Sequence, residues 1–283
     1  MPLNIKQQTS ILQLILTLFN TSPGGNTLNH LIAQLETGQS LENLAQKLAE
    51  SVLFFDKQYE ANLSSAEFAS ALTEDLLGNR ISGKNKSLIM DYIVHGISAG
   101  SSQIELISEL INVLSSTSTS DPNWGGAVLH YNIYNATKIV NHLLGDTFTA
   151  ENKTVVIEFI LTQMKAGKTF GEMIVWGIKT LVDVDHDNPV WGNAAKMFDN
   201  RVEVSRYYSV DKAGVATDLA TLQRILSGVT ANPETIDVAK AEIDKLQDNS
   251  CMRIQHNNEF RLDEVLRNMN QNVLSAAKEQ KFA

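Results

Sequence analysis

The sequence is poor in the residues that several common classes of protein require. It has one cysteine in 283 residues, which excludes a disulfide scaffold and argues against cysteine-ligated zinc or iron–sulfur sites. Lys and Arg number 23 against 32 Asp and Glu, for a formal charge of −9, so no nucleic-acid partner is expected. No apolar run reaches the roughly eighteen residues of a spanning helix, so no transmembrane segment is expected.

Residues that form turns are also scarce. Five prolines and sixteen glycines are few for this length, and aromatic residues make up only 7%. A β-sandwich or β-barrel needs many turns, so the composition favours an all-α fold. The hydrophobic fraction of 43% is ordinary for a globular protein and argues against a disordered chain.

The most apolar stretch, residues 11–19 (ILQLILTLF), lies near the N-terminus. A single Lys6 precedes it, polar Gln13 and Thr17 interrupt it, and no small-residue cleavage site follows it. These features argue against a cleaved signal peptide. We expect the stretch to form an amphipathic first helix of the fold.

The strongest signal is an internal repeat. When residues 77–127 are aligned without gaps on residues 144–194, 15 of 51 positions are identical. Unrelated sequences would match at roughly three. Gly100 falls on Gly167, and the motif Pro-x-Trp-Gly that contains Trp124 falls on the one that contains Trp191. A fainter copy lies upstream, where Gly38 aligns with Gly100.

The predicted fold is therefore all-α, with about three tandem multi-helix repeats packed into one elongated helical domain over residues 1–247. The expected parts are units at about 11–77, 78–144 and 145–211, a terminal helix pair at 212–247, and a tail at 248–283 with an amphipathic helix at 259–278. Residues 153–161 (KTVVIEFIL) resemble a strand in their β-branched content. We expect a helix there, because the matching residues 86–94 have helical apolar spacing.

The recurrent residues have structural interpretations. Gly100 and Gly167 are expected to end helices in the left-handed conformation. Asp121-Pro122 and Asn188-Pro189 are expected to open helices, as N-cap and first residue. Trp124 and Trp191 are expected to fill equivalent core positions, with stacking against a sugar as the alternative. Asn135 and Asn200 are expected to be buried amides that cap a helix or bond a loop, with ligand binding as the alternative.

The sequence offers little for catalysis. The six histidines have no metal-ligand spacing, Cys251 has no neighbouring base, and phosphate-loop, GxSxG and HExxH motifs are absent. No enzyme is expected, and no cofactor. Alternating acids at Asp183, Asp185 and Asp187 suggest either a solvated acidic loop or a calcium site. They do not form an EF-hand loop, because its sixth and twelfth positions hold Asn188 and Ala194 instead of Gly and Glu.

Three segments carry a family resemblance: 166–181 (AGKTFGEMIVWGIKTL), 187–210 (DNPVWGNAAKMFDNRVEVSRYYSV) and 218–244 (DLATLQRILSGVTANPETIDVAKAEID). They resemble a helical repeat domain of unknown function found in bacterial S-layer and RTX-type secreted proteins. The resemblance covers roughly residues 20–245 and is most specific in the third unit. The chain departs from the family in having no Gly/Asp-rich calcium repeats (GGxGxDxUx) after the helical part.

The resemblance implies a non-enzymatic cell-surface protein, similar to S-layer regions that anchor to the O-polysaccharide of lipopolysaccharide. It also implies an extracellular location, reached by type I secretion without a cleaved signal peptide. The alternative is a self-assembling subunit of a layer or filament, with other copies of the chain as partners. The residues expected to contact a polysaccharide are Tyr131, Tyr134, Arg201, Arg206, Tyr207 and Tyr208.

Overall fold

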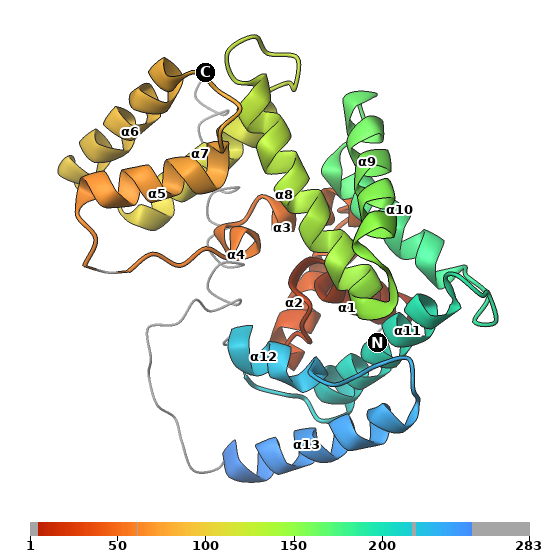
Figure 1. The fold of residues 1–283 in the computed structure, drawn as a ribbon. Coiled ribbons are helices and arrows are strands. Elements are labelled where there is room, and N and C mark those ends of the chain that lie inside the picture. Colours follow the sequence, from red (N-terminus) through yellow and green to blue (C-terminus); the bar gives the residue numbers. More distant parts are fainter. Residues whose placement is uncertain (1–4, 61, 217–218, 251–283) are drawn as a thin grey trace.

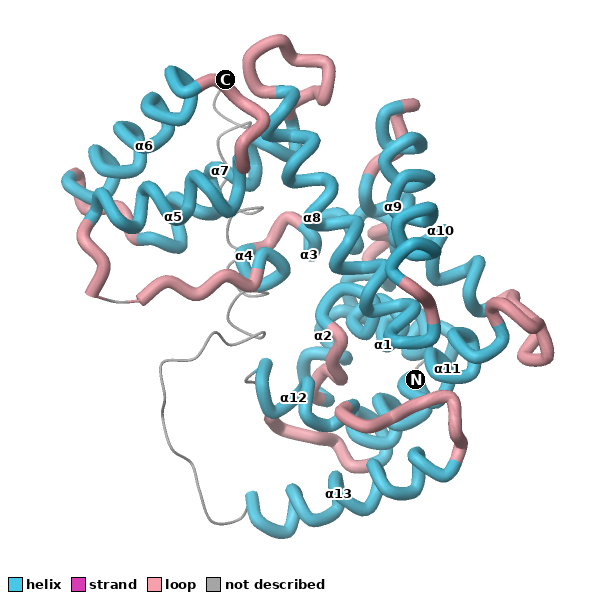
Figure 2. Tube along the Cα trace, viewed as in Figure 1, coloured by secondary structure: helices cyan, strands magenta, loops and turns pink. Residues whose placement is uncertain are grey.

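A computed structural model describes residues 5–60, 62–216 and 219–250 of the chain. These residues form helices joined by loops and contain no strand (Figures 1 and 2). The predicted all-α fold is therefore confirmed. Residues 153–161, with their strand-like composition, lie inside a helix as expected. None of the helices in the described residues combines the length and the apolar character that a membrane crossing requires.

The helices, in chain order, are α1 (Ile5–Phe19), α2 (Gly25–Glu36), α3 (Leu41–Ala49), α4 (Val52–Phe55), α5 (Ser65–Leu77), α6 (Gly83–Ser98), α7 (Gln103–Ser116), α8 (Gly125–Leu144), η1 (Gly145–Thr147), α9 (Ala150–Lys165), α10 (Phe170–Val182), α11 (Gly192–Arg206), η2 (Tyr207–Asp211), α12 (Leu219–Leu226) and α13 (Glu234–Ser250). The element η1 is a 3₁₀ turn and η2 is a π-helical turn. The predicted tail helix at 259–278 and Cys251 lie outside the described residues.

Helix α1 lies at the centre of the molecule, in contact with α2, α3, α8, α10 and α11 (Figure 1). Its second half was expected to be amphipathic, and that expectation is wrong. Six of its side chains have no exposed surface at all: Ile11, Leu12, Leu14, Ile15, Leu16 and Leu18. A helix surrounded by other helices must be apolar on every face, which residues 11–19 satisfy apart from the half-buried Gln13 and the buried Thr17. The hydroxyl of Thr17 donates to Gln13 O at 2.8 Å, so this buried polar group is also satisfied.

The core consists of two hydrophobic clusters joined by α8. The larger cluster contains α1, α2 and α3 together with residues of α9 to α13. The smaller cluster contains residues of α4, α5, α6 and α7. The first half of α8 contributes Val128 and Tyr131 to the smaller cluster, and its second half contributes Ile139 and Val140 to the larger one. Figure 1 shows α5 to α7 set apart from the remaining helices, with α8 reaching across.

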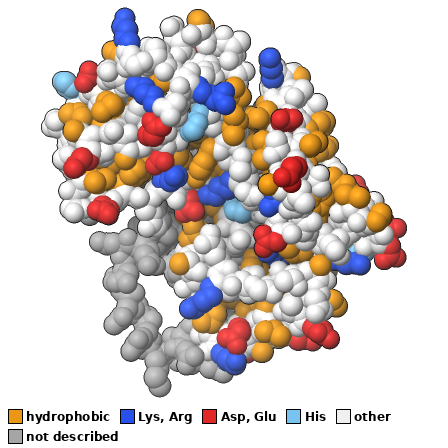
Figure 3. All heavy atoms as spheres, in the orientation of Figure 1, with side chains coloured by type: hydrophobic (Ala, Val, Ile, Leu, Met, Phe, Trp, Pro, Cys, Tyr) orange, Lys and Arg blue, Asp and Glu red, His pale blue; other side chains and the backbone are white. Residues whose placement is uncertain are grey.

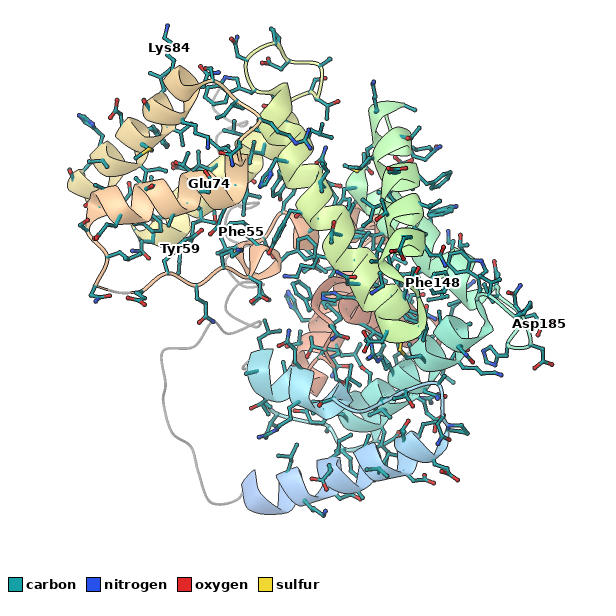
Figure 4. All side chains as sticks on the ribbon, viewed as in Figure 1. Phe55, Tyr59, Glu74, Lys84, Phe148 and Asp185 are labelled. Carbon is teal, nitrogen blue, oxygen red and sulfur yellow. The ribbon has the colours of Figure 1, made fainter. Side chains whose placement is uncertain are left out.

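Polar contacts fix α8 where the two clusters meet. Lys138 Nζ donates to Phe54 O at 2.6 Å, and Tyr134 Oη donates to Phe55 O at 2.7 Å. Both carbonyls lie at the end of α4, where no further helical turn can satisfy them. In the segment between α4 and α5, Tyr59 Oη donates to Asp75 Oδ2 at 3.0 Å, which holds this segment against α5 (Figure 4 labels Phe55 and Tyr59).

Helix boundaries recur at the spacing of the sequence repeat. Helices α6 and α9 begin at matching positions of the two copies and end at matching positions, and the starts of α7 and α10 and of α8 and α11 match in the same way. Gly100 and Gly167, which follow α6 and α9, have φ angles of 98° and 101°. In both turns the amide of the residue after the glycine bonds back to the last helical turn, from Ser101 N to Gly96 O and from Lys168 N to Gln163 O.

The two Asx-Pro motifs do not open helices as expected. Helices α8 and α11 begin only after these motifs, at Gly125 and Gly192. Instead, Asp121 Oδ1 accepts bonds from the amides of Asn123 and Trp124 in a turn before α8. Asn188 Oδ1 accepts from Val190 and Trp191 in the same way. The side chain therefore caps a turn, and the helix starts only after that turn has closed.

Helices α3 and α10 pack against each other although α4 to α9 all lie between them along the chain. Gly171, at the start of α10, makes this close approach feasible. A Cβ atom there would clash with Glu42 O and lie 2.8 Å from Gln46 N. At the matching position of α7 stands Ile104, which is 51% exposed because no helix crosses there.

We expect Gly171→Ala to destabilise the protein by about 2 kcal/mol, because backbone atoms of α3 would have to move. The measurement is the urea midpoint of the loss of helical circular dichroism. Gly83→Ala is the matched control, since Gly83 also opens a helix but has no atom within 4 Å of an added Cβ. That control should be neutral or stabilising by up to about 1 kcal/mol. Equal midpoints for the two variants would contradict the close packing of α3 on α10.

His142 joins α8 to α1. Its Nδ1–H donates to Thr17 O at 2.9 Å, because a carbonyl oxygen can only accept. Burial lowers the pKa of His142 to about 4, and the nearby charges of Lys138 and Arg201 contribute to the lowering. The folded protein thus holds the neutral imidazole across the range where a free histidine gains a proton.

The unfolded chain binds this proton below a pH of about 6.5, whereas the folded protein resists it until about pH 4. Stability should therefore fall as the pH drops from 7 towards 4, by up to about 3 kcal/mol from this residue. The test is chemical unfolding at several pH values of the wild type and of His142→Gln, in which this part of the slope should disappear. His95→Gln, at an exposed histidine, should keep the wild-type slope. An unchanged slope in His142→Gln would contradict the assignment.

Candidate functional site

Two polar side chains lie buried one turn apart on α8. Tyr131 is 4% exposed and Asn135 is 3% exposed, and their spacing of one helical turn puts them on the same face of the helix. The repeat aligns them with Phe198 and Val202 of α11, which are apolar and pack in the larger cluster. Packing at these positions is thus satisfied by apolar residues, so the polar atoms of Tyr131 and Asn135 need another explanation.

Both side chains line a cavity of about 340 Å³. Three segments that are far apart in the sequence close it against α8: the end of α3, the loop after α7 and the loop between α9 and α10. Their side chains are mostly amides, hydroxyls and a few charges: Gln46 and Glu50 at the end of α3, Ser115, Thr117, Ser118 and Thr119 at the end of α7 and just after it, and Lys165, Lys168 and Thr169 at the end of α9 and in the turn that follows. Phe170, Met164, Val128 and Leu114 supply the apolar part of the wall.

Asn135 is the residue that indicates a binding site in this cavity. Its Oδ1 atom is buried and has no hydrogen-bond donor within the described residues. An acceptor left in this state costs about 1–3 kcal/mol, so such atoms are rare unless water, an ion or a ligand satisfies them. The three other atoms of this kind, Thr21 Oγ1, Gln39 Nε2 and Thr73 Oγ1, do not belong to residues that line the cavity.

The surrounding groups are held in fixed roles. Burial raises the pKa of Tyr131, while hydrogen bonding from Asn135 and Ser115 partly opposes the rise, so the phenol stays protonated at neutral pH. Gln46 Nε2 donates to Glu50 Oε1 at 2.6 Å, and Gln46 Oε1 accepts from Gly171 N at 2.7 Å. These bonds orient the Glu50 carboxylate on the wall and leave a cavity with both donors and acceptors.

This set of groups is suited to binding a ligand through hydrogen bonds. No histidine or cysteine belongs to the described residues of the wall, so the usual nucleophile–base pair is not assembled here. Within residues 5–60, 62–216 and 219–250, no group of three His, Cys, Asp or Glu side chains is arranged to hold a metal ion. The lining fits a small polar ligand that presents several hydroxyls.

Of the six residues expected to contact a polysaccharide, Tyr131 alone lines this cavity. Tyr134 is engaged with Phe55 O, as described above. Arg201 donates to Val229 O and to Asn20 Oδ1, each at 3.2 Å. The phenol of Tyr207 donates to Asp244 at 2.9 Å, and the buried phenol of Tyr208 accepts from Ala216 N at 3.0 Å. Arg206 is exposed on α11.

The other recurrent residues occupy separate places. Trp191 is half-buried, packs on the larger cluster and lies 4.4 Å from Phe148 between ring centroids. Trp124 is half-buried and belongs to neither cluster. Asn200 Nδ2 donates to Thr230 O at 2.8 Å and so bonds the loop after α12. The side chain of Asn200 therefore bonds a loop as expected, whereas the side-chain oxygen of Asn135 has no donor within the described residues.

Asp183, Asp185 and Asp187 are exposed in the loop between α10 and α11, which projects from the molecule (Figure 4 labels Asp185). Asp185 Oδ1 accepts from Asp187 N at 2.9 Å, which closes a tight turn. At the matching positions before α8, Ser118 Oγ accepts from Ser120 N at 3.1 Å in the same turn. A serine thus does what Asp185 does, so the shape of this loop is explained without a cation.

Sequence patterns alone missed most of the cavity. Residues 115–120 stand out as a run of Ser and Thr, which is a signal for a polar loop. Gln46 and Glu50 carry no such signal, because an amide and a carboxylate one turn apart are typical of any exposed helix. Their role follows only from the packing of α3 on α10.

Figure 3 shows Lys and Arg interspersed with Asp and Glu over the face it displays, without an extended region of one sign. A phosphate-rich ligand is attracted by clustered positive charge, and this face does not supply it.

No family model, curated protein or solved structure matches this chain.

Proposed function

We propose that this protein is a non-enzymatic bacterial cell-surface module that binds polysaccharide and holds a sugar unit in the Tyr131–Asn135 cavity. The polysaccharide is the O-polysaccharide of lipopolysaccharide, the ligand that the sequence resemblance implies. The chain would then act outside the cell as an anchor on a surface or as part of a surface layer.

The observation that carries the proposal is the unpaired acceptor of Asn135 in a cavity lined by hydroxyls and amides. A sugar ring presents several hydroxyls that donate and accept, which is the complement of such a lining. The cavity volume of about 340 Å³ lies at the lower end of the range for small-molecule sites, which is suited to a single ring. Tyr131 adds a protonated phenol and Phe170 an apolar surface.

The proposal includes a tandem arrangement of helical units over residues 11–211. The matching boundaries of α6 and α9, and the matching glycines at 100 and 167, support it. In such an arrangement the ligand is expected to bind at a junction between units. The walls of the cavity come from α3 in the first unit, from α7 and α8 in the second, and from the connection between α9 and α10 in the third, which is consistent with such a junction.

Asn135→Leu provides a direct test. Leucine has a similar volume and removes the unsatisfied acceptor, so the variant should be as stable as the wild type or up to about 1 kcal/mol more stable. It should lose binding to smooth lipopolysaccharide, which carries O-polysaccharide, in a pull-down and in isothermal titration calorimetry. Stability that is not reduced, together with the loss of binding, distinguishes a ligand group from a structural one.

Asn152→Leu, at an exposed position of α9, is the control and should retain binding. Rough lipopolysaccharide, which lacks O-polysaccharide, should not bind to the wild type. Adding or chelating calcium in each titration measures whether the cation contributes. The proposal is wrong if the wild type does not bind smooth lipopolysaccharide with or without calcium, or if Asn135→Leu binds as the wild type does.

A further inference from the structure

A pair of aromatic rings lies on the surface where α9 and α10 pack together. Phe159 is 42% exposed and Trp176 is 39% exposed, and their ring centroids are 4.8 Å apart with an angle of 35° between the planes. Large aromatic side chains are usually mostly buried in a fold of this kind. Two neighbouring, tilted rings that are partly exposed to solvent form an apolar platform.

The packing of α9 on α10 does not require this pair. The matching residues on α6 and α7 are Tyr92 and Glu109, where the Tyr92 phenol donates to the Glu109 carboxylate. Tyr92 is 47% exposed, so the same position faces solvent in both places. A solvated carboxylate is therefore sufficient where Trp176 stands, and the indole is an addition that the fold does not need.

The platform forms one side of a groove of about 370 Å³. Met173 and Val175 add to its apolar surface, and the remaining residues that line it are polar or charged. The charges in this groove neutralise each other: Lys168 pairs with Glu172 at 3.0 Å, and Lys179 pairs with Glu42 at 4.0 Å. Gln163 adds an amide. A charged ligand gains little from such balanced pairs. A neutral ligand with an apolar face and a polar edge fits both the rings and the groups around them.

The groove adjoins the Tyr131–Asn135 cavity, because the side chain of Lys168 lines both. Glu42 in the groove and Gln46 in the cavity come from successive turns of α3. The two hollows therefore lie around the same short connection between α9 and α10. A ligand longer than one ring that occupies the cavity reaches the groove next.

We propose that Phe159 and Trp176 form a second subsite, which stacks against the apolar face of a neutral sugar unit of the same polysaccharide chain. This inference rests on the proposed function. The cavity holds one sugar unit by hydrogen bonds and the platform holds another by stacking. The platform then contributes to the affinity for a polymer and not to the affinity for a single sugar.

The experiment compares two probes: O-polysaccharide released from smooth lipopolysaccharide, and the neutral monosaccharides obtained from it by hydrolysis. Trp176→Ala and Phe159→Ala should each bind the polymer about tenfold more weakly than the wild type. Monosaccharide binding should be unchanged in both. Tyr92→Ala, at the matching exposed position of α6, is the control and should leave polymer binding unchanged.

Trp176→Phe keeps a ring in the platform. It should retain polymer binding to within about threefold, whereas the change in tryptophan fluorescence that the polymer causes in the wild type should disappear. This variant separates stacking from a loss of folding. Light scattering of each variant measures whether the rings contribute instead to contacts between copies of the chain.

The outcomes separate the two proposals. If the wild type binds neither probe, the proposed function fails, and this inference fails with it. If the wild type binds and Asn135→Leu does not, but Trp176→Ala binds the polymer as the wild type does, only the second subsite is overturned. A smaller particle size for Trp176→Ala with unchanged polymer binding also overturns it, since the platform is then a contact between copies.

Discussion

The burial of the second half of α1 is the constraint on which the rest of the structure depends. No single neighbour can cover a helical segment that is apolar all round, so five helices surround α1: the next two along the chain, α2 and α3, and the distant α8, α10 and α11. Among them, α3, α8 and α10 carry Gln46, Asn135 and Phe170 into one cavity. The cavity wall is therefore set by contacts with α1, although α1 itself contributes no residue to it. Weakening that core is expected to disturb the cavity before any residue of its lining is changed.

The cavity forms where helices end. The last residues of α3 and α7 and the turn between α9 and α10 meet the middle of α8. Helix ends carry polar residues because their final backbone groups lack partners within the helix. When three such ends converge on a buried helix face, a polar cavity results. Asn135 and Tyr131 then complete its inner wall, and the acceptor on Asn135 stays unpaired because the helix ends do not reach it.

The sequence predicted the helical fold, and several helix boundaries, better than it predicted the site. The internal repeat predicted that residues 153–161 form a helix despite their β-branched content, and it predicted the helix end at Gly100. The contact between α3 and α10 could not be predicted, because helical periodicity describes one helix at a time and carries no information about a partner that is distant in the chain. Similarly, a phenol such as that of Tyr207 gives the same signal in a sequence whether it binds a ligand or, as here, Asp244.

Comparison of matching positions separates what the fold needs from what the site needs. Gly100 and Gly167 are identical and serve the same backbone turn. Ile104 and Gly171 differ because α3 crosses only one of the two places. Tyr131 and Asn135 stand opposite Phe198 and Val202, and Trp176 stands opposite Glu109. Tyr131 and Asn135 place polar atoms in a buried wall, and Trp176 exposes part of an indole to solvent. Each of these features costs stability unless a group outside the chain contacts it. Tyr131 and Asn135 line the cavity and Trp176 lines the groove, so these exchanges fall where the proposed polysaccharide would contact the chain.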